Sequence, residues 1–159
     1  MNESALHTAG RFTCITACYD DDMEFFGPFE GQYLTGLALS ILIGLIIGLE
    51  RESRGKDAGI STHIMVIAGS ALFTLLSATV DPNSTSRIAS QIVVGIGFLG
   101  AGLILKESAS VKNLTTAASL WFAAALGMAI GFGFYAIAII GAIAAALIPR
   151  IPNVRKKDS

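Results

Sequence analysis

The stretch NLTTAASLWFAAALGMAIGFGFYAIAIIGAIAAALIP, residues 113–149, contains no Asp, Glu, Lys or Arg. A helix needs about 20 apolar residues to cross a bilayer, so this stretch is too long for one crossing and about right for two. Clustered glycines favour a break in a helix, and Gly127, Gly131 and Gly133 lie near its middle. The stretch therefore predicts two membrane-spanning helices with a turn at these glycines.

Three further apolar stretches precede it, and each is long enough for one membrane crossing. They are Gly31–Leu49, Ile60–Val80 and Ile88–Leu105. In the whole chain of 159 residues, 14% are charged and 53% are hydrophobic, whereas soluble domains carry about 25% charge. So few charges do not cover the surface of a water-soluble fold. We therefore predict an all-α integral membrane protein whose domain, residues 31–149, has five transmembrane helices.

Two polar segments flank this domain. Residues 1–30 hold six of the twelve acidic residues and one base, Arg11, and we expect an acidic, disordered N-terminal tail. The abrupt change in composition raises the alternative that Met23 is the natural start. Residues 150–159 form a basic tail. The net charge of −1 provides no positive field for nucleic acid, which excludes nucleic-acid binding as the expected function.

The Lys and Arg residues predict the orientation in the membrane. Five spans place the 50–59 loop, the 106–112 loop and the C-terminal tail on one side, and these segments hold nine of the eleven bases. A model with four spans removes this asymmetry. Because basic loops stay in the cytoplasm, we predict an N-terminus outside and a C-terminus in the cytoplasm.

Small residues at four-residue spacing predict the helix contacts, since in lipid they allow helix backbones to approach closely. Such residues in the first and fourth spans are Gly36, Ser40, Gly44, Gly48, Gly127 and Gly131. We expect them to pack helices within one bundle. A dimer seam and an ion path are the alternatives.

The third span contains Gly95, Gly97, Gly100 and Gly102, which match the pattern G-x-G-x-x-G. A dinucleotide-binding loop also needs an acidic residue about 20 positions further on, and the chain has none there. We therefore interpret the pattern as a glycine-lined membrane helix that packs on its neighbours. Gln91, one turn into this span, is expected to support the bundle by hydrogen bonding to a neighbouring helix.

Polar residues inside or near a bilayer are candidates for function because their burial is costly. In this chain they gather at the predicted cytoplasmic ends of the helices, where side-by-side packing brings them toward one polar pocket. The candidates are Glu50, Arg51, His63, Lys112, Thr115 and Thr116.

Several of these residues also have structural explanations. Glu50 and Arg54 are four residues apart and are expected to pair. Asn113 is expected to cap the fourth helix, and His63 has the alternative of a hydrogen-bonded packing residue.

A magnesium site is poorly supported by the pattern. Mg²⁺ binds carboxylates and retained waters, whereas Glu50 and Glu52 point in different directions on one helix and the inner surface is net positive. An anionic lipid headgroup, a nucleotide or an acidic partner surface fits this charge better. The sequence shows no nucleophile–base pair or metal-ligand cluster, so we expect no enzymatic activity and no cofactor.

Three motifs together resemble the MgtC/SapB family of membrane proteins. The first joins Gly44 and Gly48 to Glu50-Arg51-Glu52 and Thr62-His63. The second is RIASQIVVGIGFLGAG, residues 87–102, and the third is VKNLTTAASLW, residues 111–121, followed by the glycines at 127–133. The motifs occur in the family's order and cover about residues 31–148.

The resemblance implies an all-helical protein of the bacterial or archaeal inner membrane, linked to growth at low Mg²⁺. Virulence-linked members carry a cytoplasmic C-terminal domain, whereas here we expect the transmembrane domain alone. The family also commonly has Arg where this chain has Ser61, and both departures argue against a virulence-type role. We expect a regulator that binds another membrane protein or a lipid, with homo-oligomers as a further expectation. A transporter or channel for Mg²⁺ or another small ion is the alternative.

Overall fold

The computed structural model describes residues 28–80, 84–107 and 110–151. Residues 1–27 of the predicted N-terminal tail, with Met23, and most of the basic C-terminal tail lie outside these residues, whereas residues 28–30, which the prediction assigned to the tail, begin the first helix. The helices are α2 (Pro28–Ser53), α3 (Ile60–Val80), α4 (Ser86–Leu103), α5 (Leu114–Gly131), α6 (Tyr135–Leu147) and the 3-10 turn η1 (Ile148–Arg150), and the strands are β1 (Leu105–Glu107) and β2 (Ser110–Lys112).

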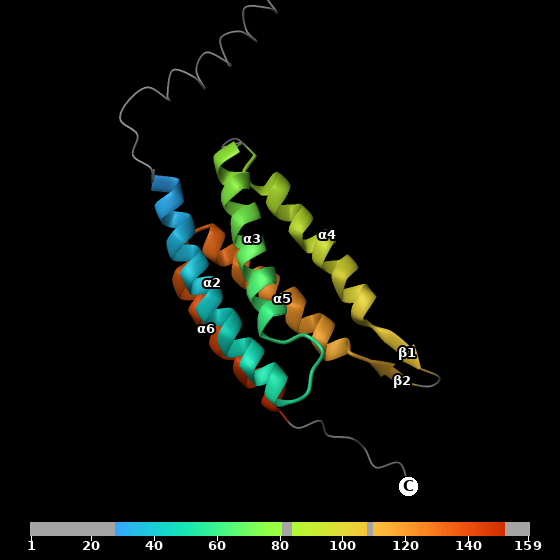
Figure 1. The fold of residues 1–159 in the computed structure, drawn as a ribbon. Helices are drawn as coiled ribbons and strands as arrows, with labels where there is room; N and C mark the ends of the chain where they lie inside the picture. The colour runs from blue at the N-terminus through green and yellow to red at the C-terminus, as the bar shows by residue number, and fades with distance from the viewer. Residues whose placement is uncertain (1–27, 81–83, 108–109, 152–159) are drawn as a thin grey trace, which may run out of the picture.

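The helices alternate in direction and form one bundle (Figure 1). This arrangement confirms the predicted all-α membrane protein. Helices α2 to α5 have the length and hydropathy of membrane spans, whereas the last helical segment, Tyr135–Arg150, is shorter. At 1.5 Å per residue, α6 rises about 20 Å, less than the roughly 30 Å of the hydrocarbon core. The fifth predicted helix is therefore present but shorter than a full crossing.

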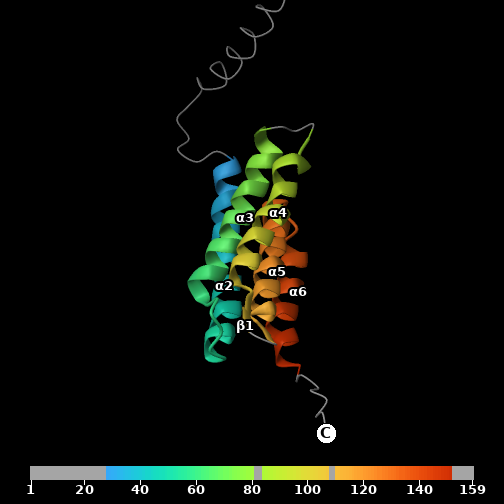
Figure 2. The ribbon, with the colours of Figure 1, turned by 90° about the vertical axis from the view of Figure 1, so that its right-hand side faces the viewer.

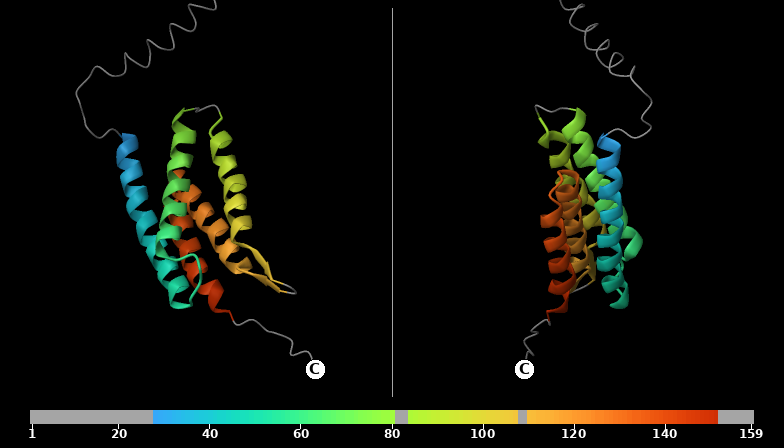
Figure 3. Two further views of the ribbon diagram at one scale, coloured as in Figure 1. Left: turned by 45° about the vertical axis from the view of Figure 1, so that its right-hand side comes forward. Right: turned by 90° about the vertical axis from the view of Figure 1, so that its left-hand side faces the viewer.

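Helix α3 lies between α2 and α4, and α5 and α6 lie behind them (Figure 3). Viewed from the side, the helix axes run along a common direction (Figure 2). The apolar core lies where α2, α3, α5 and α6 meet, and it includes Ile43, Ile67, Ile130 and Ala138. Large apolar side chains on the outside, such as Ile140, are exposed, as a lipid-facing surface requires.

The glycines of α2 pack directly on α3, as the sequence predicts. A Cβ atom at Gly44 would lie 2.7 Å from the Cα of Ile64, and one at Gly48 would collide with the backbone of Ile60. Side chains at these positions would push the two helices apart. The row therefore serves close helix packing within one chain.

The glycines of α5 pack on the other side of α3. A Cβ at Gly131 would lie 2.6 Å from the carbonyl oxygen of Ala71, and one at Gly127 would lie 2.6 Å from the Cβ of Ser70. Their expected packing role is confirmed as well. Helix α3 is thus held on two sides by glycine contacts.

The glycines of α4 differ from the expectation. A Cβ at Gly100 would make an ordinary contact with Ala117, but Gly95, Gly97 and Gly102 have no neighbouring atom within 4 Å of that position. The physical reason is that α4 buries only a narrow stripe, at Ala89, Ile96 and Gly100, and the other glycines lie off it. The prediction that all four pack the bundle was wrong for these three.

Gln91 also lies off the buried stripe of α4. Its side chain is exposed and lines a groove between α3 and α4. Among the described residues it has no hydrogen-bond partner, contrary to the expectation. The polar contact between these helices comes from Ser77 of α3. Its Oγ donates to the carbonyl of Thr85 and accepts from the N–H groups of Ile88 and Ala89, so α3 caps the first turn of α4.

The connections at the inner end bring separate segments together. The predicted 106–112 loop contains a short antiparallel hairpin, β1 and β2. Asn113 does occupy the N-cap position of α5, with φ of 64°, but its side chain does not cap the helix. Its Nδ2 donates instead to Oδ2 of Asp57, at 2.5 Å. The turn between α5 and α6 falls at Gly133, with φ of 81°, as predicted.

Candidate functional site at the inner end of the bundle

The end of α2, the start of α5 and the end of α6 lie at the same end of the bundle (Figure 1). We call it the inner end, because the sequence predicts that it faces the cytoplasm. A pocket of about 710 Å³ opens there between these helices. We call it the inner-end pocket, and it is lined by Ile47, Arg51, Arg54, Lys56, Thr115, Ala118, Ser119, Phe122, Ala145, Ile148, Pro149, Arg150 and Ile151.

Arg51 connects the first helix to the fourth. The residue is 2% exposed, and its Nη2 donates a hydrogen bond of 2.7 Å to Oγ1 of Thr116, which is fully buried. The two residues are 65 positions apart in sequence. Two of the predicted candidates are therefore in direct contact, across the α2–α5 interface.

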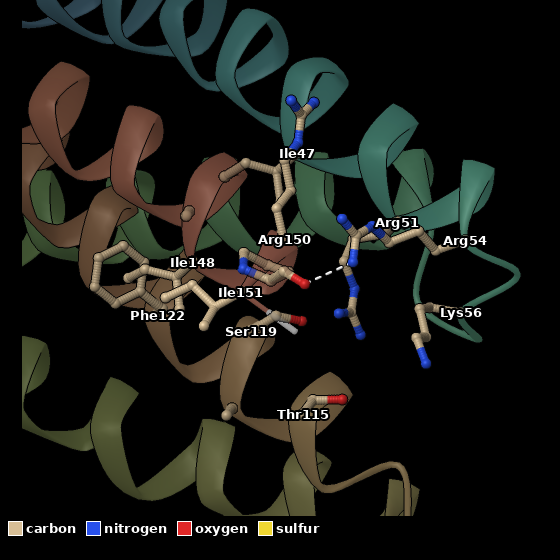
Figure 4. Close-up of a pocket in the computed structure, with 13 residues that line it drawn as sticks. Ile47, Arg51, Arg54, Lys56, Thr115, Ser119, Phe122, Ile148, Arg150 and Ile151 are labelled. Carbon is tan, nitrogen blue, oxygen red and sulfur yellow. Dashed lines mark hydrogen bonds between the residues drawn. The ribbon is translucent and has the colours of Figure 1, made fainter. Parts of the chain in front are cut away.

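Arg54 connects α2 to the end of α6. Its Nε lies 2.5 Å from Oε1 of Glu50, one helical turn away. Its Nη1 donates a 2.6 Å hydrogen bond to the carbonyl oxygen of Pro149. The expected pair between Glu50 and Arg54 is thus confirmed, and the same guanidinium also binds the last turn of the bundle (Figure 4).

The pocket has a positive side and an apolar side. Arg51, Arg54 and Lys56 lie together at one side, whereas Phe122, Ile148 and Ile151 lie at the other (Figure 4). The hydroxyl groups of two further lining residues, Thr115 and Ser119, come from α5. Such a lining suits a ligand with one anionic end and one apolar end.

The charge of the pocket follows from its contacts. Its four basic residues are Arg51, Arg54, Lys56 and Arg150. Among these bases, Arg54 is paired with a carboxylate, that of Glu50. The hydrogen-bond partner of Arg51 is a neutral hydroxyl. The pocket therefore has an excess of positive charge.

The structure brings four of the six predicted candidates to the pocket or its arginines and leaves two elsewhere. Arg51 and Thr115 line the pocket, and Glu50 and Thr116 contact its arginines. His63 is fully buried but does not line it, and its Nδ1 lies 2.8 Å from the carbonyl oxygen of Gly59. This contact fits the alternative of a hydrogen-bonded packing residue.

Lys112 also lies away from the pocket lining. The residue is the last of β2, and it is exposed. The convergence predicted from the helix ends therefore holds for α2 and the first turn of α5, and it does not extend to His63 or Lys112.

Most of the lining residues were not among the sequence candidates; they include Lys56, Ser119, Phe122 and Arg150. Ser119 and Phe122 follow Thr115 at intervals of four and seven residues, so they share its helix face, and this spacing was available in the sequence. The position of Arg150 depends on how α6 packs beside α2, which no local pattern specifies.

A groove of about 530 Å³ lies between α3 and α4 and is lined largely by apolar side chains such as Phe73 and Leu99. Within residues 28–80, 84–107 and 110–151, no three His, Cys, Asp or Glu side chains lie close enough together to hold a metal ion.

Comparison with known proteins identifies the family. The family model described as the MgtC family matches residues 37–155, which include every helix that builds the pocket. The chain belongs to the MgtC family. The resemblance seen in the three motifs is therefore confirmed.

Curated relatives support the same assignment. The protein named MgtC of Salmonella typhimurium strain LT2 is 42% identical over 127 residues, which cover 80% of this chain and 53% of that protein. The putative magnesium transporter YhiD of Escherichia coli K12 is 40% identical over 129 residues, 74% of this chain and 59% of that protein. An uncharacterized protein of Synechocystis is 42% identical over 113 residues, 70% of this chain and 48% of that protein.

The matches cover only part of each relative. The chain spans about half the length of the curated relatives it matches. No solved structure matches it.

Proposed function

We propose that this MgtC-family protein acts in Mg²⁺ homeostasis as a regulator in the membrane, and that the inner-end pocket binds its membrane-protein or lipid partner. The link to Mg²⁺ is supported by the family and by the name of the Escherichia coli relative. The observation that carries the regulatory role is the positive lining of the pocket, with four basic residues and one contacting carboxylate, Glu50. This lining favours an anionic partner.

The same lining disfavours Mg²⁺ as the ligand of this pocket. A divalent cation would be repelled by Arg51, Lys56 and Arg150, and Mg²⁺ prefers carboxylate and water oxygens. The glycine row of α2, at Gly44 and Gly48, is occupied by the backbone of α3. Within one chain, the glycine row of α2 therefore leaves no space for an ion to pass along it.

The proposed site belongs to the inner membrane, with the inner end in the cytoplasm. Support comes from the sequence, because the five-span prediction assigns nine of the eleven bases to this side and basic loops stay in the cytoplasm. We further propose that the protein is not an enzyme, because the pocket lining offers hydroxyl groups and bases without a nucleophile–base pair.

Growth measurements test the role in Mg²⁺ homeostasis. A strain lacking the gene is grown across a series of Mg²⁺ concentrations. It is complemented with the wild type, with the double variant Lys56→Gln/Arg150→Gln, or with Arg87→Gln. The last variant is the control, because it also removes positive charge but at the outer end. We expect a defect at low Mg²⁺ that the wild type and Arg87→Gln restore and the pocket variant does not. Equal growth with and without the gene at every concentration would contradict the proposal.

Transport is tested separately. The purified protein is reconstituted in liposomes that contain a Mg²⁺-sensitive dye. We expect no selective Mg²⁺ flux above that of empty liposomes. Selective flux that disappears in the Glu50→Ala variant would replace the regulator by a transporter.

A further inference from the structure

We propose that the inner-end pocket is a binding site for one anionic phospholipid, whose phosphate lies among the bases and whose glycerol and acyl segments lie along the apolar side. This inference rests on the proposed function, because it names the partner of the same site. Four features of the pocket carry it: a buried charge, available bases at the rim, an apolar side and a position at the membrane surface.

The first feature is the charge of Arg51. A buried guanidinium is stable when a carboxylate or phosphate compensates it. Arg51 is 2% exposed, and its hydrogen-bond acceptor is the neutral hydroxyl of Thr116. Its Nε is buried and has no acceptor among the described residues, while the nearby Glu50 pairs with Arg54. The chain thus supplies less negative charge than the site needs, and a ligand phosphate would supply the rest.

The second feature is the rim. Lys56 and Arg150 are exposed, line the pocket and form no ion pair with another described residue. They come from the α2–α3 loop and from η1, so they approach the pocket from two different segments. Bases that line a pocket without carboxylate partners are available to an entering anion.

The third feature is the apolar side, which separates a lipid from a soluble anion. Ile47 of α2, Phe122 of α5 and Ile148 at the end of α6 line the same pocket as the bases. A free phosphate would leave these side chains uncovered. A phospholipid would cover them with its glycerol and upper acyl carbons, since burial of apolar area is favourable.

The fourth feature is the location. Basic pockets between helices on the cytoplasmic side of a membrane bind anionic lipid headgroups, and the cytoplasmic leaflet carries such lipids. The pocket lies between α2, α5 and α6 at the inner end (Figures 1 and 4). Its volume of about 710 Å³ is within the range of small-molecule sites.

Native mass spectrometry of the full chain tests the proposal. The detergent-solubilised protein is titrated with phosphatidylglycerol, with cardiolipin and with zwitterionic phosphatidylcholine. We expect one tightly bound anionic lipid per chain, with at least tenfold preference over phosphatidylcholine. The exposed double variant Lys56→Gln/Arg150→Gln is expected to lose roughly fivefold in affinity for each base removed, whereas Arg87→Gln at the outer end keeps wild-type binding.

The outcomes separate the ligand sources and the two proposals. Equal binding of anionic and zwitterionic lipids, or equal losses in the pocket variant and Arg87→Gln, would overturn the lipid site. Inorganic phosphate and glycerol 3-phosphate are added as competitors, and saturation by either at micromolar concentration would also overturn it in favour of a soluble anion. Lipid preference of the wild type decides the question even if a variant is unstable. Because lipid binding and growth at low Mg²⁺ are separate measurements, failure of one proposal is distinguishable from failure of the other.

Discussion

The Nη2 atom of Arg51 lies 2.7 Å from Oγ1 of Thr116, and both residues are buried. This bond fixes the last turn of α2 against the first turn of α5. The second guanidinium on the same helix end, that of Arg54, binds the carbonyl of Pro149 after α6. The two arginines thus hold three helix ends together, and their positive charge faces the pocket that these ends form.

The Thr116→Val substitution tests the bond to Arg51. Valine keeps the shape of threonine but removes the acceptor, so a buried guanidinium N–H would lose its partner at a cost of about 1–3 kcal/mol. We expect the free energy of unfolding, measured by SDS titration in mixed micelles, to fall by that amount.

Thr115→Val is the matched control, since Thr115 is the exposed neighbour on the same turn. We expect it to change the free energy of unfolding by about 0.5 kcal/mol or less. Equal effects of the two variants would contradict the assigned role of Thr116.

The Gly44→Ala substitution tests the close packing of α2 on α3. The new methyl group would lie 2.7 Å from the Cα of Ile64, so the helices must separate. Overpacking of this kind costs about 1–3 kcal/mol, and we expect the midpoint of thermal unfolding in detergent to fall.

Gly95→Ala in α4 provides the comparison, because its Cβ would meet no atom within 4 Å. Alanine also favours the helix over glycine by about 1 kcal/mol. We expect unchanged or higher stability. A loss of stability at Gly95 as large as that at Gly44 would contradict the open space beside Gly95.

The Ser77→Ala substitution tests how α3 caps α4. The Oγ of Ser77 lies 3.2 Å from the amide nitrogen of Ile88 and 3.3 Å from that of Ala89. Loss of a side-chain cap costs about 0.5–2 kcal/mol. We expect faster amide hydrogen exchange in the first turn of α4.

Ser90→Ala is the control for this cap. The Ser90 hydroxyl is exposed and donates to the carbonyl of Arg87 within its own helix, so its removal should leave exchange in that turn unchanged. Equal exchange rates in the Ser77 and Ser90 variants would contradict the cap.

Cysteine labelling tests the orientation of the bundle. After Cys14 and Cys18 are replaced by Ser, single cysteines are introduced as Lys56→Cys at the inner end and Arg87→Cys at the outer end; both residues are exposed. Because basic loops are retained in the cytoplasm, we expect a membrane-impermeant maleimide to label Arg87→Cys in spheroplasts and Lys56→Cys in inside-out vesicles. The reverse pattern would contradict the predicted topology.

Several features of the site could be predicted from sequence. The i,i+4 spacing of Glu50 and Arg54 predicted their ion pair, which the structure contains. The alternation of spans predicted that Arg51 and Thr116 lie at the same end of the bundle. Local spacing does not specify which helices are neighbours. The sequence therefore could not show that Arg51 contacts Thr116 and not Lys112 or His63, which belong to the same predicted cluster.

The glycines show the same distinction. Four-residue spacing predicted that Gly44 and Gly127 pack a helix, and they do. Helix α4 is equally rich in glycine, yet a Cβ atom at Gly95 or Gly97 would meet no atom within 4 Å. A small residue permits a close approach, but only the position of a neighbouring helix determines whether one occurs.

By itself, the sequence determined that this protein lies in a lipid bilayer and that its fold is built from apolar helices. Long apolar stretches with almost no charge require lipid around them, because charges and unpaired backbone groups are costly there, and the glycine cluster after Gly127 required a turn. Only the tertiary structure decided the pocket, since the ends of α2, α5 and α6 are far apart in sequence. Packing α6 beside α2 brings Arg150 and the apolar Ile148 to the arginines of α2, and this juxtaposition creates a site that is both cationic and apolar.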